Sequence, residues 1–183
     1  NLPHMGDIVY GDDPDDVLRL IHMLTKESER RRGLFAEAAT DNYTAFIRSC
    51  DTRKQFERVP AIVVLIDGIA QLLETISEDE PKQLLFTLLK EGSSRGLFFV
   101  VTALSTSELP SRMLSNFHGV ALRLHDRSDY QDVVGKRMPG DMSDILSYAG
   151  RGVVALEDDV FEMQTAVCFP QAVDAERAEG IGL

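Results

Sequence analysis

The stretch Ala61-Ile-Val-Val-Leu-Ile-Asp-Gly-Ile-Ala-Gln-Leu-Leu73 decides the fold class of this chain. Its first six residues are all apolar, which is typical of a central strand in a parallel sheet that is covered on both faces. The run ends at one acid, Asp67, and Gly68 follows it directly. The apolar residues after Gly68 recur at helical spacing. The stretch therefore predicts a buried strand, a turn that carries a single carboxylate, and a helix.

Length and charge narrow the classes of protein that fit. The 183 residues suit one domain, and the net charge is −11, from 19 Lys and Arg against 30 Asp and Glu. So acidic a surface repels a phosphate backbone unless basic side chains gather on one face, and we expect no nucleic-acid partner. The chain does not begin with Met, and we expect it to be a piece of something longer. No segment is apolar over the roughly 20 residues that a membrane span needs, so we expect this piece to be soluble and cytosolic.

Cysteine and histidine residues are too scattered to predict a metal site or a disulfide framework. None of them shows the C-x-x-C or paired-histidine spacing of a metal-binding motif. The expected metal site is therefore none. The residues concerned are Cys50, Cys168, His4, His22, His118 and His125.

A long amphipathic helix is predicted near the start of the chain. Asp13 suits the N-cap and Pro14 the first helical position, and apolar residues then recur at helical spacing as far as residue 38. Residues 30–32 are three arginines. We expect them on a solvated face, with salt bridges to Glu27 and Glu29, in preference to a phosphate-binding patch. A second, short helix is expected from residue 41 or 42.

The remainder of the chain alternates strands and helices, which predicts a layered α/β sheet that is mostly parallel. Helices are expected at residues 69–76, 81–90, 105–114 and 128–134. Buried strands are expected at residues 61–66, 97–102 and 119–124, and residues 152–156 and 161–167 are expected to form a terminal hairpin. Residues 171–183 are polar, and we expect a loose tail.

In an open α/β sheet, a binding site lies beyond the carboxyl ends of the strands, so Asp67, Thr102 and Ser105 are the candidate site residues. A nucleoside triphosphatase uses one acid on its Mg²⁺ ion and a neighbouring residue to orient the attacking water. Asp67 suits the first role, whereas Gly68 has no side chain for the second. The alternative is that Asp67 merely caps the next helix.

The phosphate-binding loop that such chemistry needs is missing from the sequence. The pattern G-x-x-x-x-G-K-[ST] does not occur. Residues 135–137, Gly-Lys-Arg, lack both the earlier glycine and the hydroxyl residue. The signatures of serine hydrolases and zinc proteases are missing as well. We therefore expect no hydrolysis of ATP by this chain alone and no resident cofactor.

The order of several segments resembles an FtsK/SpoIIIE-type ATPase module of the EssC/EccC family of type VII secretion. The resemblance covers about residues 1–169. The expected division is a partial module at residues 1–170 and a C-terminal tail at residues 171–183. The resemblance is carried by residues 2–6, 29–38, 59–67 and 91–96, and more distally by residues 122–129 and 150–152.

The resemblance implies a RecA-like sheet of the P-loop NTPase type, with Asp67 as the Walker B acid and Thr102 and Ser105 at the sensor strand. The phosphate loop would lie upstream of the given sequence, so binding of Mg-ATP by the intact module is left open. Hydrolytic members carry an acid where Gly68 stands. DNA-translocating members carry a Gln-Arg pair after the sensor strand, where this chain has residues 102–106, Thr-Ala-Leu-Ser-Thr.

The leading interpretation is a degenerate, non-hydrolysing module of a membrane-anchored EssC/EccC protein at the cytoplasmic face of the membrane. The resemblance implies as partners a secreted WXG100-like substrate or its C-terminal signal peptide, the adjacent ATPase modules, and a hexamer in the full machine. Three alternatives stay open. They are an ATPase module that binds or hydrolyses nucleotide, an FtsK-like DNA translocase, and a generic α/β domain in which Asp67 caps a helix.

Overall fold

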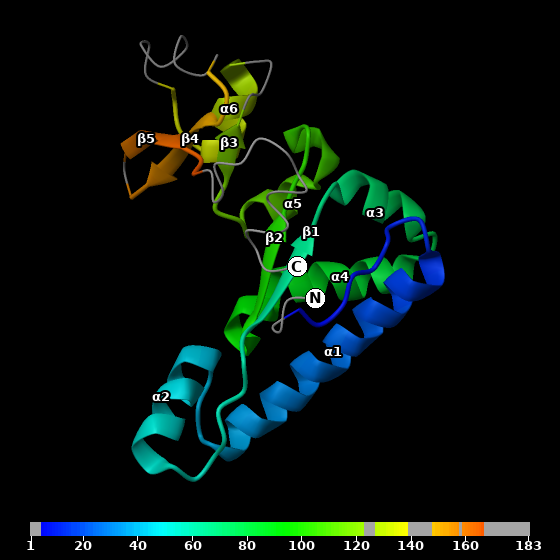
Figure 1. Cartoon of the computed structure of the whole chain (residues 1–183), viewed down its shortest axis with the longest axis vertical. Helices are drawn as coiled ribbons and strands as arrows, with labels where there is room; N and C mark the ends of the chain where they lie inside the picture. The colour runs from blue at the N-terminus through cyan, green and yellow to red at the C-terminus, as the bar shows by residue number, and fades with distance from the viewer. Residues whose placement is uncertain (1–4, 123–126, 139–147, 158, 167–183) are drawn as a thin grey trace, which may run out of the picture. The chain divides into compact units, whose positions relative to one another are not determined.

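A computed structural model describes residues 5–122, 127–138, 148–157 and 159–166 of the chain (Figure 1). The contacts divide it into two compact units. One unit is Val9–Phe117, and the other contains the strands from Val120 onward. Several predicted features lie outside the described residues. They are the tail at residues 171–183, the end of the hairpin at residue 167, residues 123–126, and three of the six cysteines and histidines. In the part of the chain that the structure describes, no helix is long and apolar enough to cross a membrane.

Helix α1, Pro14–Glu37, begins as its capping residues predict. The side chain of Asp13 accepts hydrogen bonds from the backbone N–H groups of Asp15, at 3.1 Å, and Asp16, at 3.2 Å. Pro14, which has no N–H group to satisfy, takes the first helical position. The helix buries one apolar stripe, so burial of that stripe, rather than helix propensity alone, holds α1 in place. The stripe includes Val17, Ile21, Leu24 and Phe35.

Helix α2, Tyr43–Arg53, packs on the end of α1 and forms a small core of its own. Asn42 caps it, accepting a 2.9 Å hydrogen bond from the N–H group of Ala45. The rings of Phe35 and Phe46 stack with centroids 4.7 Å apart. Cys50 lies buried in the same cluster as a free thiol.

The two predicted strands that follow α2 form a parallel pair. Strand β1, Ile62–Ile66, pairs with β2, Leu97–Val101, in a register that sets Ile62 opposite Leu97. Between them the chain forms α3, Ile69–Thr75, α4, Asp79–Glu91, and the 3₁₀ turn η1, Gly92–Arg95. Beyond β2 come η2, Thr106–Glu108, and α5, Ser111–Leu114. Helices α1 and α4 pack together, and the larger core lies between them and one face of the strand pair.

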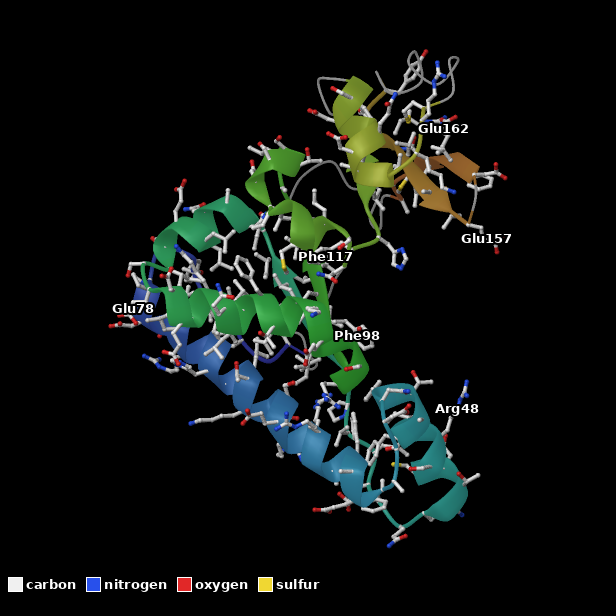
Figure 2. All side chains as sticks on the ribbon, turned by 180° about the vertical axis from the view of Figure 1, so that it is seen from behind. Arg48, Glu78, Phe98, Phe117, Glu157 and Glu162 are labelled. Atoms are coloured by element: carbon white, nitrogen blue, oxygen red, sulfur yellow. The ribbon has the colours of Figure 1, made fainter. Side chains whose placement is uncertain are left out.

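The opposite face of the strand pair is open to solvent, so the prediction of strands covered on both faces is wrong for the described residues. Side chains alternate between the two faces of a strand, and every second one here is exposed. Figure 2 shows Phe98 projecting from β2 on the side away from α4. The open face consists of Val63, Leu65, Phe98 and Val100, which are 59%, 74%, 40% and 54% exposed.

The second unit holds an antiparallel sheet of order β3-β4-β5. Its strands are Val120–Leu122, Arg151–Leu156 and Asp159–Gln164, and α6, Arg127–Val134, packs on them. The β4-β5 pair confirms the predicted hairpin. The predicted third strand, in contrast, pairs with β4 in the antiparallel direction rather than with the parallel pair. The expectation of a mostly parallel sheet therefore holds only for β1 and β2.

Candidate functional site

The predicted site residues Asp67 and Thr102 lie together at the carboxyl ends of the parallel pair. The hydroxyl group of Thr102 donates a 2.7 Å hydrogen bond to Oδ1 of Asp67. The same hydroxyl oxygen accepts a 2.9 Å hydrogen bond from the N–H group of Gly68. Both side chains are exposed. The pair therefore presents an ordered carboxylate to solvent at the end of β1.

The backbone around Gly68 explains why glycine stands at this position. Gly68 has φ +79° and ψ +74°, in the left-handed region, and it caps the start of α3. A Cβ atom here would meet no other atom within 4 Å, so space is not the obstacle. The obstacle is the backbone conformation, which costs a residue with a side chain about 1–2 kcal/mol. A glutamate at position 68 would thus strain this turn by about 1–2 kcal/mol.

Ser105, the third predicted site residue, is held within its own turn. Its hydroxyl oxygen accepts a 3.2 Å hydrogen bond from the N–H group of Ser107 and lies 3.0 Å from the Ser107 hydroxyl oxygen. These are the contacts of an N-cap of η2. Among the described contacts, none joins Ser105 to Asp67. The structure therefore brings two of the three candidates together.

The chemistry of Asp67 and Thr102 fits one side of a Mg-nucleotide site. Mg²⁺ binds proteins through one or two carboxylates and takes its other ligands from phosphates and water. Asp67 supplies one such carboxylate. In the part of the chain that the structure describes, no cluster of three or more His, Cys, Asp or Glu side chains could hold a metal ion on its own. The donor set is thus compatible with a metal ion that arrives with a nucleotide.

The glycine-lysine pair that failed the phosphate-loop pattern has another use in the structure. Gly135 follows α6 with φ +67°, in the left-handed region that glycine favours. The ammonium group of Lys136 donates a hydrogen bond to the backbone carbonyl of Glu157. These residues therefore link α6 to the β4-β5 hairpin within the second unit.

An apolar cavity lies beside Asp67. It has a volume of about 380 Å³ and is lined by residues of α1, β1, α3, α4, β2 and the segment 9–12. Asp12, Asp67 and Gln71 are among its polar lining residues. Its walls are mainly aliphatic and include Val17, Ile21, Leu24, Val64, Ile66, Leu72, Leu85 and Phe99.

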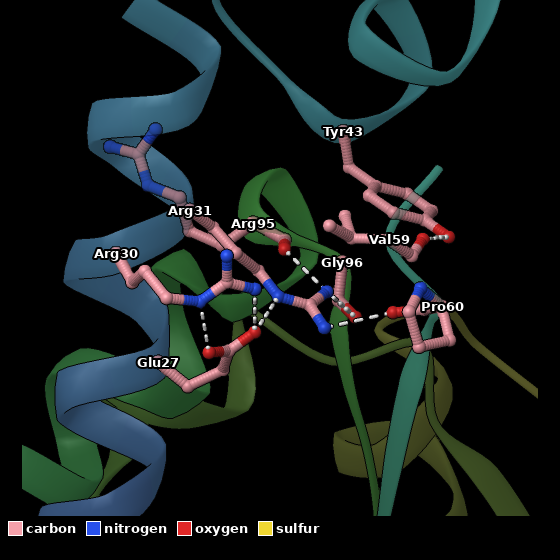
Figure 3. A network of polar contacts seen from close by, with 8 residues as sticks. All are labelled: Glu27, Arg30, Arg31, Tyr43, Val59, Pro60, Arg95 and Gly96. Carbon is pink, nitrogen blue, oxygen red and sulfur yellow. Dashed lines mark hydrogen bonds and ion pairs between the residues drawn. The ribbon is translucent and has the colours of Figure 1, made fainter. Parts of the chain in front are cut away.

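The arginine run at residues 30–32 is divided by the structure, and the expectation of a solvated face is wrong for Arg31. Arg30 makes a two-pronged ion pair with Glu27, at 2.7 and 2.8 Å, as predicted. Arg31 is only 1% exposed. It donates to Glu27 at 2.7 Å and to the backbone carbonyls of Arg95, Gly96 and Pro60 at 3.1, 3.2 and 2.8 Å (Figure 3). Arg31 therefore ties α1 to the amino ends of both strands.

Glu27 is the carboxylate of this network. Hydrogen bonds from Arg30 and, to a lesser extent, Arg31 lower the pKa of Glu27 from 4.5 to about 2, although its partial burial acts in the opposite direction. A charge buried without partners would be costly, and here the guanidinium of Arg31 has four acceptors. The helical spacing could have indicated that Arg31 is buried, because Arg31 stands seven residues after Leu24 and four before Phe35 on the buried stripe of α1.

Curated relatives of the chain are type VII secretion proteins. The chain is 20% identical over 161 residues to the type VII secretion system protein EssC of Staphylococcus aureus, which covers 87% of this chain and 10% of the relative. It is 24% identical over 145 residues to the ESX secretion system protein EccC of Geobacillus thermodenitrificans, a match that covers 79% of this chain and 9% of the relative. The chain thus spans about a tenth of the curated relatives that it matches. No protein-family model matches it.

Solved structures share its fold. A structure of EssC ATPases 2 and 3 from Geobacillus thermodenitrificans matches with a TM-score of 0.68 at 21% identity, over 90% of this chain and 30% of that one. The pCW3 conjugation coupling protein TcpA, in its monomer form with ATPγS, matches with a TM-score of 0.65 at 18% identity, over 83% and 44%. The cytoplasmic domain of the type VII secretion ATPase EccC of Thermomonospora curvata matches with a TM-score of 0.63 at 13% identity, over 88% of this chain and 19% of that one.

Proposed function

Since the chain is a distant homologue of the FtsK/SpoIIIE-type ATPase modules of EssC and EccC over most of its length, we propose that it is part of a module that does not hydrolyse ATP. Its role in this proposal is to recognise secreted proteins, or to regulate neighbouring modules, in a type VII secretion machine. The proposed partners are the C-terminal signal segment of a WXG100-like substrate and the adjacent ATPase modules. The proposed setting is the cytoplasmic face of the membrane, within a hexamer.

The observation that carries the proposal is the conformation of Gly68. An enzyme of this class needs a group that polarises the attacking water next to the metal-side acid, and removing such groups typically costs orders of magnitude in rate. At position 68 there is no side chain, and the backbone lies in the left-handed region that disfavours one. The apolar cavity beside Asp67 supports a binding role, because apolar hollows with a few polar groups are what ligand sites have in common.

Two measurements test this function, one of binding by the chain and one of ATP turnover by the intact module. Candidate signal peptides and purified adjacent modules are titrated against the chain by isothermal calorimetry, and saturable binding to one of them is expected. ATP turnover is measured on the intact module, with its phosphate-loop part included, and no turnover above that of an Asp67→Asn variant is expected. Failure of both ligand classes to bind would refute the recognition role.

A second candidate function is an ATPase module that binds or hydrolyses Mg-ATP with a phosphate loop from outside this sequence. The ordered pair of Asp67 and Thr102 favours it, because a carboxylate at this strand end is where a metal-side acid is needed. Mg-ATP would then be the ligand, with Asp67 on the metal ion. ATP turnover that Asp67→Asn abolishes would establish this alternative in place of the first.

A further inference from the structure

The outer face of α1 carries its charges in two separate groups. The acids Asp15 and Asp16 lie in the first turn, and the bases Lys26 and Arg30 lie about three turns further along. Because residues 15, 26 and 30 are 11 and 4 residues apart, they project from the same side of the helix. The whole chain has a net charge of −11, so a basic group here departs from the average surface. One exposed face of α1 therefore has an acidic end and a basic end.

Between the two charged groups lies an exposed apolar side chain. Met23 is 56% exposed, although the buried side of the same helix is apolar. A shallow hollow of about 470 Å³ surrounds it, and all the lining residues belong to α1, so the hollow is open to an element that lies along the helix. The lining consists of Arg19, His22, Met23, Lys26, Glu27 and Arg30.

This face belongs to the surface of its module. The side chain of Arg19 is 75% exposed and pairs with Asp16 at 2.7 Å, whereas Lys26 has no ion-pair or hydrogen-bond partner among the described residues. Lys and Arg are almost never fully buried unless paired, because burial of an unpaired charge is costly. Further parts of the module can cover the apolar open face of the strand pair. The outer face of α1, in contrast, accepts only a surface that brings matching charges.

A second copy of the same helix brings the matching charges. When two α1 helices lie antiparallel, the acidic first turn of each faces Lys26 and Arg30 of the other. With Asp16 opposite Arg30, the two-fold axis passes residue 23, so the two Met23 side chains meet in the middle. A parallel pair would instead set acid against acid and base against base. The face is thus self-complementary, as a two-fold contact requires.

We propose that the outer face of α1 is a self-association surface, on which a second copy of the chain places its own α1 in the antiparallel direction. This goes beyond the proposed function, because a ring is built from head-to-tail contacts and does not need a two-fold one. One helix face is a small interface, so the dissociation constant is about 10 µM to 1 mM. The net charge of each copy opposes approach, but physiological salt screens it beyond about 8 Å.

Charge reversal tests the pairing by sedimentation velocity at concentrations up to about 1 mM. The double variants Asp15→Lys/Asp16→Lys and Lys26→Glu/Arg30→Glu should each associate about tenfold or more weakly than the unchanged chain, because several exposed ion pairs become like-charge contacts. An equimolar mixture of the two variants should associate again, since each altered group then meets its opposite. Restored association also shows that both variants fold. An unchanged chain that stays monomeric would overturn the proposal.

A substitution at the two-fold axis tests the same contact without removing an ion pair. Met23→Lys sets two like charges against each other and should weaken association about tenfold. Its side chain is exposed, so the fold should be kept, which thermal denaturation checks. The matched control is Ala36→Lys, which adds the same exposed side chain on another side of α1 and should leave association unchanged. Equal effects of the two substitutions would overturn the proposal.

Disulfide cross-linking tests the direction of the two helices. In a Cys168→Ser background, the Asp16→Cys chain should cross-link to the Arg30→Cys chain in preference to a copy of itself. Preferred cross-links between identical chains would indicate a parallel pair and contradict the proposal.

The same sedimentation measurements are made on the intact module with its phosphate-loop part. Loss of association there would assign this face to the rest of the module and overturn the proposal. The charge-reversed variants should still bind any signal segment that the unchanged chain binds. Failure of self-association and failure of the proposed recognition function are therefore separate results.

Discussion

Thr102 and Asp67 stand 35 residues apart in the chain and are joined by a 2.7 Å hydrogen bond at the ends of two neighbouring strands. The hydroxyl group of Thr102 donates to the carboxylate and accepts from the N–H group of Gly68. One side chain thus orders both the acid and the turn that follows it.

Thr102→Val is therefore expected to lower the free energy of unfolding by about 0.5–1.5 kcal/mol, the usual net value of a hydrogen bond. It removes the donor to Asp67 and the acceptor for Gly68. Thr102→Ser keeps the hydroxyl group and should retain most of the stability. Urea denaturation of the three proteins measures the difference. Equal losses in the valine and serine variants would mean that the bond does not matter.

Two glycine-to-alanine substitutions should change the free energy of unfolding in opposite directions. Gly68→Ala is expected to lower the free energy of unfolding by about 1–2 kcal/mol, because φ at this residue is +79°. Gly33 is exposed within α1, and a Cβ atom there meets nothing. Gly33→Ala should therefore raise stability by about 0.5–1 kcal/mol. Thermal or chemical denaturation gives both numbers, and a stabilising effect at residue 68 would contradict the turn described here.

Arg31→Lys is expected to destabilise the protein by about 2–3 kcal/mol, although it conserves charge. A lysine cannot present the planar fork that reaches Glu27 and three carbonyls at once. The matched control is Arg32→Lys on the exposed side of the same helix, which should change stability by less than about 0.5 kcal/mol. Similar effects at the two positions would argue against the buried network.

Stability should fall as the pH drops from about 4.5 to about 2. Arg30 and Arg31 lower the pKa of Glu27 to about 2, so its contribution is fully present above pH 4.5 and is lost as the pH falls through the folded value. The Glu27 side chain keeps 23% exposure, so we expect an effect on the order of 2 kcal/mol rather than the full linkage value. Glu27→Gln should reduce the loss of stability between about pH 4.5 and about pH 2, whereas Glu29→Gln should leave that loss unchanged. An unchanged slope in Glu27→Gln would contradict the assignment.

The open face of the strand pair should make the protein bind hydrophobic dyes. Leu65→Thr together with Val100→Thr is expected to lower binding of anilinonaphthalene sulfonate with little loss of stability, because both side chains are exposed. Val64 points to the covered face. Val64→Thr should instead cost about 1–2 kcal/mol in unfolding experiments. Dye binding that the double substitution leaves unchanged would place the exposed apolar surface elsewhere.

The helices could be predicted from the sequence because their signals are local. Asp13, Pro14 and the apolar spacing place the start of α1, and Asn42 that of α2. The same spacing contained the burial of Arg31, but three consecutive arginines read as a polar surface. What the helical period cannot provide is the set of carbonyls that Arg31 meets, since those are 29 to 65 residues away in the chain.

The sheet could be predicted only in part because strand pairing is not local. The apolar runs located β1, β2 and β3 correctly along the chain. Such a run does not specify its neighbour, and β3 pairs with the hairpin rather than with β2. It does not specify how many faces are covered either, as Leu65 shows at 74% exposure.

Two of the three candidate site residues could be selected correctly from their positions at the ends of predicted strands. The rule that a site lies beyond the carboxyl ends of the strands selected Asp67 and Thr102 as candidates, and the structure has them in contact. Ser105 was included because it follows Thr102 closely, but its hydroxyl group caps a turn. The left-handed conformation of Gly68 and the cavity next to it depend on packing, which residue types alone do not reveal.

The guanidinium of Arg31 closes two large loops, since its carbonyl partners Pro60 and Arg95 lie 29 and 64 residues further along the chain. Bringing such distant segments together costs loop-closure entropy before any hydrogen bond compensates for it, so we expect this set of hydrogen bonds to form late in folding. Substitutions at Arg31 should then accelerate unfolding far more than they slow folding. The expected signature of an Arg31 substitution is thus a faster unfolding rate with a nearly unchanged folding rate.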